Sequence, residues 1–140
     1  MASPNEIHKL MFDAWNRRDF AAMKAQLHAE YTYAGGDGKE TTGGPDAGVA
    51  VAQGYAAAFP DGRVEIRNSY TSGNVAIAEY RARGTHGGEL LGVAATGRPV
   101  DIVICNVIEM RDGKVYRERE YVDLYAILQQ IGAAGSAAGA

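Results

Sequence analysis

The chain has 140 residues, which is enough for one domain with a hydrophobic core. Hydrophobic residues make up 46% and charged residues 22%, as in ordinary soluble proteins, and the net charge of −3 argues against nucleic-acid binding. The single cysteine, Cys105, excludes an internal disulfide framework and favours a reducing cytoplasm. Neither a membrane-spanning apolar run nor a signal-peptide pattern occurs, so we expect a cytoplasmic protein without membrane contact.

The first part of the chain carries the spacing of amphipathic helices. Ile7 to Trp15 follow the i, i+3, i+4, i+7 pattern, and Asp19 is placed to cap a second helix that carries Phe20. A proline at position 60 stops a third helix that begins near Pro45. We therefore expect helices over 7–15, 20–27 and 45–59, a short strand at 31–33, and a glycine-rich loop at 35–44.

The second part alternates apolar and polar residues, which is typical of strands. Strands are predicted over 64–70 and 75–83, then a break at 84–88, a loop or short helix at 90–97, a hairpin from 100 to 122, and a closing helix over 124–131. Helices followed by strands indicate an α+β fold with helices on one face of a mostly antiparallel sheet. We expect one domain at 1–132 and a flexible Gly/Ala/Ser tail at 133–140.

The hairpin is the strongest local signal, because Asp112-Gly113 lies between two alternating runs. A two-residue turn without irregularity pairs Asn106 with Arg119 and Ile104 with Tyr121. One face is then mostly apolar with few polar groups, which is typical of a ligand pocket. That predicted pocket face consists of Ile102, Ile104, Asn106, Ile108, Met110, Val115, Arg119, Tyr121 and Asp123.

Short motifs along nearly the whole chain resemble the SnoaL-like polyketide cyclase family. The matching segments are AWNRRD at 14–19, AFPD at 58–61, GTHGG at 84–88, TGR at 96–98, RDGK at 111–114, EREYVD at 118–123 and LQQIG at 128–132. The resemblance implies the cone-shaped nuclear-transport-factor-like fold shared with ketosteroid isomerase, in which helices pack on a strongly curved sheet around an internal pocket.

The resemblance also implies an activity, namely the intramolecular aldol closure of a ring in an aromatic polyketide ester, without metal or cofactor. It places the acid/base of that reaction at Asp123. Two positions depart from the family, because the preceding strand offers Asn106 and Glu109 where the cyclases have a histidine, and Arg119 replaces a tryptophan. No carboxylate lies near residues 33–35, where ketosteroid isomerase keeps its base, so we expect no steroid isomerisation.

Each candidate residue also has a structural interpretation. Asp123 directly precedes a helix and is equally suited to be its N-cap. His86 is a candidate catalytic helper or a loop histidine held by backbone groups. Arg119 either polarises a carbonyl or pairs with an acid such as Glu79, and Tyr121 either binds substrate or belongs to the core.

The remaining candidates concern the shape of the pocket, a metal and a partner. Asn106 either binds an enolate oxygen or is a satisfied buried amide. The scattered histidines offer no metal-ligand spacing, so no metal is expected. The outer hairpin face (Val103, Cys105, Val107, Tyr116 and Val122) is half apolar, which favours a homodimer. The candidate aromatic slot consists of Trp15, Tyr33, Tyr55, Phe59 and Tyr80.

The leading function is therefore a cofactor-free cyclase-type enzyme with a small aromatic or hydrophobic substrate. The alternatives are a related polyketide hydroxylase or oxygenase, and a non-catalytic protein that binds a small molecule on the same fold.

Overall fold

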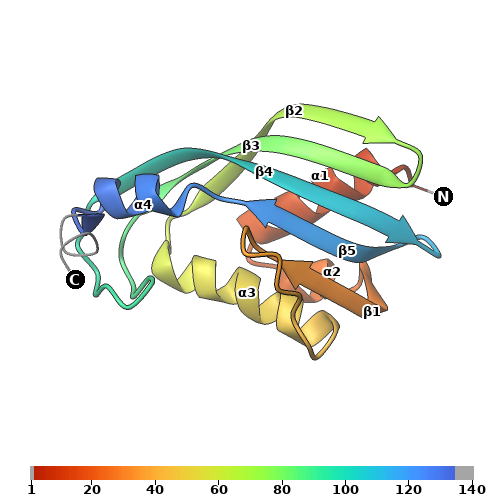
Figure 1. The fold of residues 1–140 in the computed structure, drawn as a ribbon, viewed down its shortest axis with the longest axis horizontal. Coiled ribbons are helices and arrows are strands. Elements are labelled where there is room, and N and C mark those ends of the chain that lie inside the picture. Colours follow the sequence, from red (N-terminus) through yellow and green to blue (C-terminus); the bar gives the residue numbers. More distant parts are fainter. Residues whose placement is uncertain (1, 135–140) are drawn as a thin grey trace.

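The computed structural model describes residues 2–134, so that most of the predicted tail, positions 135–140, lies outside the described residues. Four helices and five strands form one α+β unit, as expected (Figure 1). In chain order the elements are α1 (Pro4–Asn16), α2 (Phe20–Lys24), β1 (Leu27–Ala34), α3 (Pro45–Ala58), β2 (Arg63–Ser72), β3 (Val75–Thr85), β4 (Pro99–Arg111), β5 (Lys114–Tyr121) and α4 (Leu124–Gln130).

The five strands form a single curved sheet in the order β1-β5-β4-β3-β2 (Figure 1). Three of the four strand pairs are antiparallel, and β1 pairs with β5 in parallel. Helix α1 packs against β2, β3 and β4, whereas α3 packs against β1, so the two helices cover one face of the sheet. The predicted α+β class with helices on one face of a mostly antiparallel sheet is confirmed.

Most residues that were predicted to start or cap a helix do so in the structure. Pro4 and Pro45 occupy first-turn positions of α1 and α3, where a missing N–H costs nothing, and the Asp19 carboxylate accepts a hydrogen bond from the Ala22 backbone N–H. The second helix is shorter than expected and ends at Lys24. Leu27 instead begins β1, because its side chain is buried in the core beside the sheet and Leu27 aligns with Val115 of β5.

The predicted hairpin turn is confirmed, but the predicted register of β5 is wrong. Asp112 and Gly113 both have positive φ, as a two-residue primed turn requires, and Arg111 faces Lys114. A bulge then follows, because Met110 pairs with Val115 while Glu109 pairs with Arg117, so one extra residue enters β5. All later β5 side chains therefore point to the face opposite to the one predicted.

The extra residue is Tyr116, whose ring is held between two partners. The Arg111 guanidinium carbon lies 3.7 Å from the ring centroid, and the His28 ring meets it edge-on at 5.4 Å. These contacts keep Tyr116 outside next to Arg117, although neighbouring strand residues normally alternate. The next residue, Glu118, consequently points inward.

The outer face of the sheet exposes apolar side chains. Val103 is 58% exposed and Tyr121 is 52% exposed. Val122, which was predicted to lie on this face, lines the interior of the fold instead. The homodimer through this face stays a prediction, which light scattering at micromolar concentration tests. Among the described residues no helix is long and apolar enough to span a membrane.

Candidate functional site

A mostly apolar cavity lies between the sheet and the helices α1 and α3. It encloses about 120 Å³, close to the roughly 150 Å³ of an engineered apolar cavity that holds benzene. An open groove of about 680 Å³ adjoins it, since Phe12, Arg63, Val64 and Arg83 line both. The deeper cavity lining includes His8, Met11 and Trp15 of α1, Ala52 and Tyr55 of α3, and Tyr33, Tyr80, Ile102, Ile104, Asn106, Glu118 and Glu120 of the sheet.

Two carboxylates from the same strand meet in this cavity. The bulge in β5 turns Glu118 and Glu120 inward, where Asn106 lies on the adjacent strand β4. The Asn106 Nδ2 donates to Glu118 Oε2 at 2.7 Å and to Glu120 Oε2 at 2.8 Å. Asn106 is fully buried and Glu120 is 8% exposed. One amide group therefore bridges the two acids within the protein interior.

Three tyrosine hydroxyls complete the hydrogen bonding of the carboxylate pair. Tyr31 donates to Glu118 Oε1 at 2.5 Å, Tyr80 donates to Glu120 Oε2 at 2.7 Å, and Tyr33 donates to Glu120 Oε1 at 3.2 Å. Burial, followed by the nearby carboxylates, raises the pKa of each hydroxyl above its ordinary value. The hydroxyls therefore stay protonated and act as donors.

The position of Tyr31 depends on one glycine. A Cβ added at Gly48 of α3 would lie 2.3 Å from Tyr31 Cε1, which is far inside van der Waals contact. The absence of a side chain at Gly48 lets the Tyr31 ring pass beneath α3 and reach Glu118.

Among the described residues, no positively charged group pairs with the two carboxylates. Within residues 2–134 every salt bridge involves other acids. Burial, and secondarily the neighbouring Glu120 carboxylate, raises the pKa of Glu118 to about 7. Two close carboxylates cannot both ionise freely, so Glu118 takes up a proton with a midpoint near neutral pH. Such a pair contains both a base and an acid.

A histidine from α1 joins this network from the other side of the amide. His8 is 1% exposed, and its Nε2 lies 2.7 Å from Asn106 Oδ1. Burial lowers the pKa of His8, which favours the neutral ring, and Phe12 stacks on it with ring centroids 5.1 Å apart. The buried chain of contacts therefore runs from His8 through Asn106 to both glutamates.

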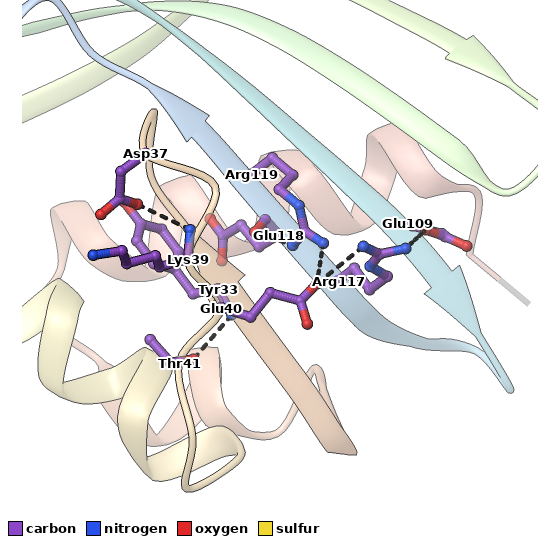
Figure 2. Close-up of polar contacts among 9 residues, drawn as sticks. All are labelled: Tyr33, Asp37, Lys39, Glu40, Thr41, Glu109, Arg117, Glu118 and Arg119. Atoms are coloured by element: carbon purple, nitrogen blue, oxygen red, sulfur yellow. Dashed lines mark hydrogen bonds and ion pairs between the residues drawn. The ribbon is translucent and has the colours of Figure 1, made fainter.

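The opposite face of β5 holds an ion-pair network, which Figure 2 shows. Glu40, in the loop between β1 and α3, pairs with both Arg117 and Arg119, the former at 2.9 Å. Arg117 also lies 3.9 Å from Glu109 of β4. These charges lie at the surface and attach the loop to the sheet.

Six of the predicted site residues line the cavity. Asn106 lies at its polar end. The five aromatic residues predicted to form a slot also contribute to the lining, and they are Trp15, Tyr33, Tyr55, Phe59 and Tyr80. Trp15 also connects α1 to α3, since its Nε1 donates to the Ala52 carbonyl at 3.1 Å.

The residues predicted from the unbulged register lie elsewhere. Asp123 is exposed and serves as the N-cap of α4, where its carboxylate accepts from the Ala126 N–H at 3.0 Å. Its predicted place on the pocket face is therefore wrong. Arg119 and Tyr121 also point outward, for the same reason, and Arg119 pairs with Glu40 instead of Glu79.

His86 does not line the cavity either. It is fully buried in the loop between β3 and β4, where its Nδ1 lies 2.9 Å from Thr96 Oγ1 and accepts from the Thr96 N–H at 3.3 Å. Its backbone exchanges hydrogen bonds with Gly97 and Arg98. This arrangement matches the interpretation of His86 as a loop histidine held by its neighbours.

Sequence reasoning missed His8, Glu118, Glu120 and Tyr31. A signal for His8 exists, because it is spaced at i, i+3 and i+7 with Met11 and Trp15 of the cavity face. The alternation of acids and arginines over 117–120 indicates that both acids share one face. It does not indicate which face, since that depends on the bulge.

A metal centre requires several ligand side chains that converge on one point. Among the described residues no group of three or more His, Cys, Asp or Glu side chains is arranged to hold a metal ion. The two glutamates bind protein donors at all four carboxylate oxygens.

Comparisons with known proteins agree with this fold. A candidate SnoaL-like polyketide cyclase from Jannaschia sp. CCS1 superimposes with a TM-score of 0.86 at 22% identity, over 93% of this chain and 92% of that one. The candidate hydroxylase AclR from Streptomyces galilaeus gives 0.82 at 23%, over 92% and 80%. A hypothetical protein with a ketosteroid isomerase-like fold from Catenulispora acidiphila, in complex with trimethylamine, gives 0.77 at 20%, over 94% and 95%.

The family of the protein is identified from its sequence. No curated protein sequence matches the chain significantly. The family model described as SnoaL-like polyketide cyclase, however, matches residues 5–131, which include all but the first residue of α1, the whole sheet and α4. The chain therefore belongs to the SnoaL-like polyketide cyclase family.

Proposed function

We propose that the protein is a polyketide cyclase-type enzyme that closes a ring by an intramolecular aldol reaction, with Glu118 and Glu120 as its acid/base pair. The observation that carries this proposal is the buried carboxylate pair, which Asn106 bridges inside an apolar cavity. Membership in the SnoaL-like polyketide cyclase family supports the substrate class, an aromatic polyketide ester.

The reaction needs a base and then an acid at the same place. A carboxylate removes a proton from the carbon between two carbonyl groups, the resulting enolate carbon attacks a third carbonyl, and the new alkoxide takes up a proton. A new carbon–carbon bond forms and no atom is lost, so the product is an isomer of the substrate. A pair that holds one proton provides the ionised base and the protonated acid together.

The surroundings of the pair suit this task. The pKa of Glu118, at about 7, matches the neutral pH at which general acid–base catalysis is most effective. The apolar and aromatic walls exclude water and accommodate a planar ring. The enclosed volume matches one aromatic ring, so a larger substrate would extend past Arg63 and Arg83 into the groove.

The test uses an aromatic β-keto ester polyketide, with products followed by mass spectrometry. We expect an isomeric product of unchanged mass from the wild type, and a rate lower by about 10² to 10⁴ for Glu120→Gln and Glu118→Gln. Asp123→Asn is the matched control, because asparagine retains the N-cap and position 123 lies outside the cavity. Loss of turnover in Asp123→Asn alone would contradict the assignment of the pair.

The same experiment distinguishes the related oxygenase. AclR, which has the same fold, is a candidate hydroxylase. A product heavier by one oxygen atom, together with dioxygen uptake, would show that the protein is a hydroxylase and not a cyclase.

A second candidate function is the non-catalytic binding of a small organic amine. Two observations favour it, namely the carboxylate pair without a positive partner in an aromatic cavity, and the fold neighbour from Catenulispora acidiphila that is in complex with trimethylamine. Aromatic faces and carboxylates both attract ammonium groups. Calorimetry with trimethylamine tests this candidate, which predicts saturable binding that Glu120→Gln weakens and no conversion of any polyketide ester.

A further inference from the structure

The Asn106 amide, which bridges the two glutamates, also has a buried partner on its other side. His8 arrives from α1, and its Nε2 lies 2.7 Å from Asn106 Oδ1. The contact is buried, with Asn106 fully enclosed and His8 1% exposed. The His8 imidazole is therefore connected to the two carboxylates through the Asn106 side chain.

The hydrogen-bond pattern fixes the direction of the Asn106 amide. The group has a donor end, Nδ2, and an acceptor end, Oδ1. Nδ2 faces Glu118 and Glu120, which are acceptors when ionised, so Oδ1 faces His8. His8 must then carry its proton on Nε2. If the amide turned over, its oxygen would face the carboxylates and its NH₂ group would face the His8 N–H.

We propose that His8 is a positioning residue, which holds the Asn106 amide nitrogen toward both glutamates. The inference rests on the proposed acid/base function of Glu118 and Glu120. His8 does not touch the reacting atoms in this scheme. It acts only through Asn106.

His8 is well held for such a role. It lies in the regular helix α1, and the Phe12 ring stacks on it at an interplanar angle of 22°. Its low pKa favours one charge state, the neutral ring, near pH 7. The other groups that face the carboxylates are neutral as well, since they are the hydroxyls of Tyr31 and Tyr33 on β1, Tyr80 on β3 and, near Glu120, Tyr55 on α3.

Removal of the His8 contact has a defined consequence for protonation. Without a donor at Oδ1, the Asn106 side chain is free to rotate away, and the ionised carboxylates lose a hydrogen bond. A hydrogen bond to the charged form lowers the pKa of a carboxyl, so its loss raises that pKa. We expect His8→Phe to move the pKa of the pair upward by roughly 0.5 to 1 pH unit.

The control is a conservative variant of the same residue. The Nε2 of glutamine occupies nearly the position of a histidine Nε2 and donates a hydrogen bond, whereas asparagine is too short. We therefore expect His8→Gln to retain the wild-type titration, and His8→Asn to resemble His8→Phe. Lys9→Gln, on the exposed side of the same helix, controls for a general effect on α1.

Two readouts separate this inference from the proposed function. The first is the titration of ¹³C-labelled glutamate carboxyl groups by NMR, which needs no substrate. The second is the pH profile of kcat/KM, whose acid limb we expect to move to higher pH in His8→Phe by the same amount. If the wild type has no turnover, the proposed function fails while the NMR titration still decides the role of His8.

The outcomes are distinct even if one variant folds poorly. A higher midpoint in His8→Phe or His8→Asn, with a wild-type midpoint in His8→Gln, supports the positioning role. Equal midpoints in the wild type and all folded His8 variants would overturn it. An upward shift in His8→Gln equal to that in His8→Asn would also overturn it, because donation to Asn106 would then not matter.

Discussion

The two faces of β5 carry opposite charges in opposite settings. Glu118 and Glu120 point into an apolar cavity, where neutral donors bind them and no salt bridge among the described residues reaches them. Arg117 and Arg119 alternate with them along the strand and point to the surface, where Glu40 pairs with both (Figure 2).

This difference shows how environment assigns roles to neighbouring charges. At the surface, water solvates each charge, so an ion pair contributes little to stability and its pKa shift has few consequences. In the cavity an unpaired charge is costly, so one carboxyl of the pair retains a proton near neutral pH. The inner face is therefore suited to proton transfer, and the outer face holds a loop in place.

The largest expected difference between the faces is in turnover. Glu120→Gln should lower the rate of the proposed ring closure by about 10² to 10⁴, because the base is lost. Arg119→Gln, one residue away, should change it by less than about threefold, since Arg119 does not line the cavity. Equal losses in the two variants, measured under single-turnover conditions, would remove the distinction between the faces.

Stability against pH should distinguish the faces next. The folded-state pKa of Glu118, about 7, lies above its unfolded value near 4.5, so the folded protein binds the proton more tightly. The free energy of unfolding therefore decreases as pH rises from about 4.5 through 7. Because Glu118→Gln removes the titrating group, this decrease should be smaller by up to about 3 kcal/mol in the variant. Urea unfolding at pH 5 and pH 8 measures it, with Glu65→Gln on exposed β2 as control. A pH dependence unchanged in Glu118→Gln would contradict the account.

The sequence predicts the elements better than the site, for a physical reason. Capping residues, prolines and alternation are local signals, so they correctly place most helix ends, most strands and the Asp112-Gly113 turn. The identity of the inward-facing residues of β5 depends on one inserted residue, Tyr116. Its outward position comes from Arg111 and His28, and the His28 contact is distant in sequence. A period-two pattern does not contain that information.

The consequence is clearest at two carboxylates. Asp123 follows β5 in the same short segment as Glu120, and the assumption of an unbulged strand places Asp123 inside and Glu120 outside. The structure has the reverse, with Glu120 buried and Asp123 at the helix end. Asn106 is correctly placed, because β4 precedes the bulge and retains its alternation.

Asp123 should behave as a structural residue. Asp123→Ala removes the N-cap of α4 and should destabilise the protein by about 1 kcal/mol, whereas Asp123→Asn should be nearly neutral. Thermal unfolding of the two variants measures this difference. The account would be contradicted if both variants retained full stability and lost turnover.

The smallest effect belongs to the outer ion pairs. Glu40→Gln should lower the stability only slightly at low salt and less at high salt, because the pairs with Arg117 and Arg119 are partly solvated. Denaturant unfolding at two ionic strengths provides the measurement. A large loss of stability that persists in high salt would show that these ion pairs do more than attach a surface loop.

The central claim is that a carboxyl group on the inner face of β5 titrates near neutral pH. An NMR titration of ¹³C-labelled glutamate side chains tests it directly in the wild type and in Glu118→Gln. We predict one resonance with a midpoint near 7 that is absent from Glu118→Gln. If every glutamate of the wild type titrated below about pH 5, the inner pair would be fully ionised at neutral pH, and the proposed acid/base role would be contradicted.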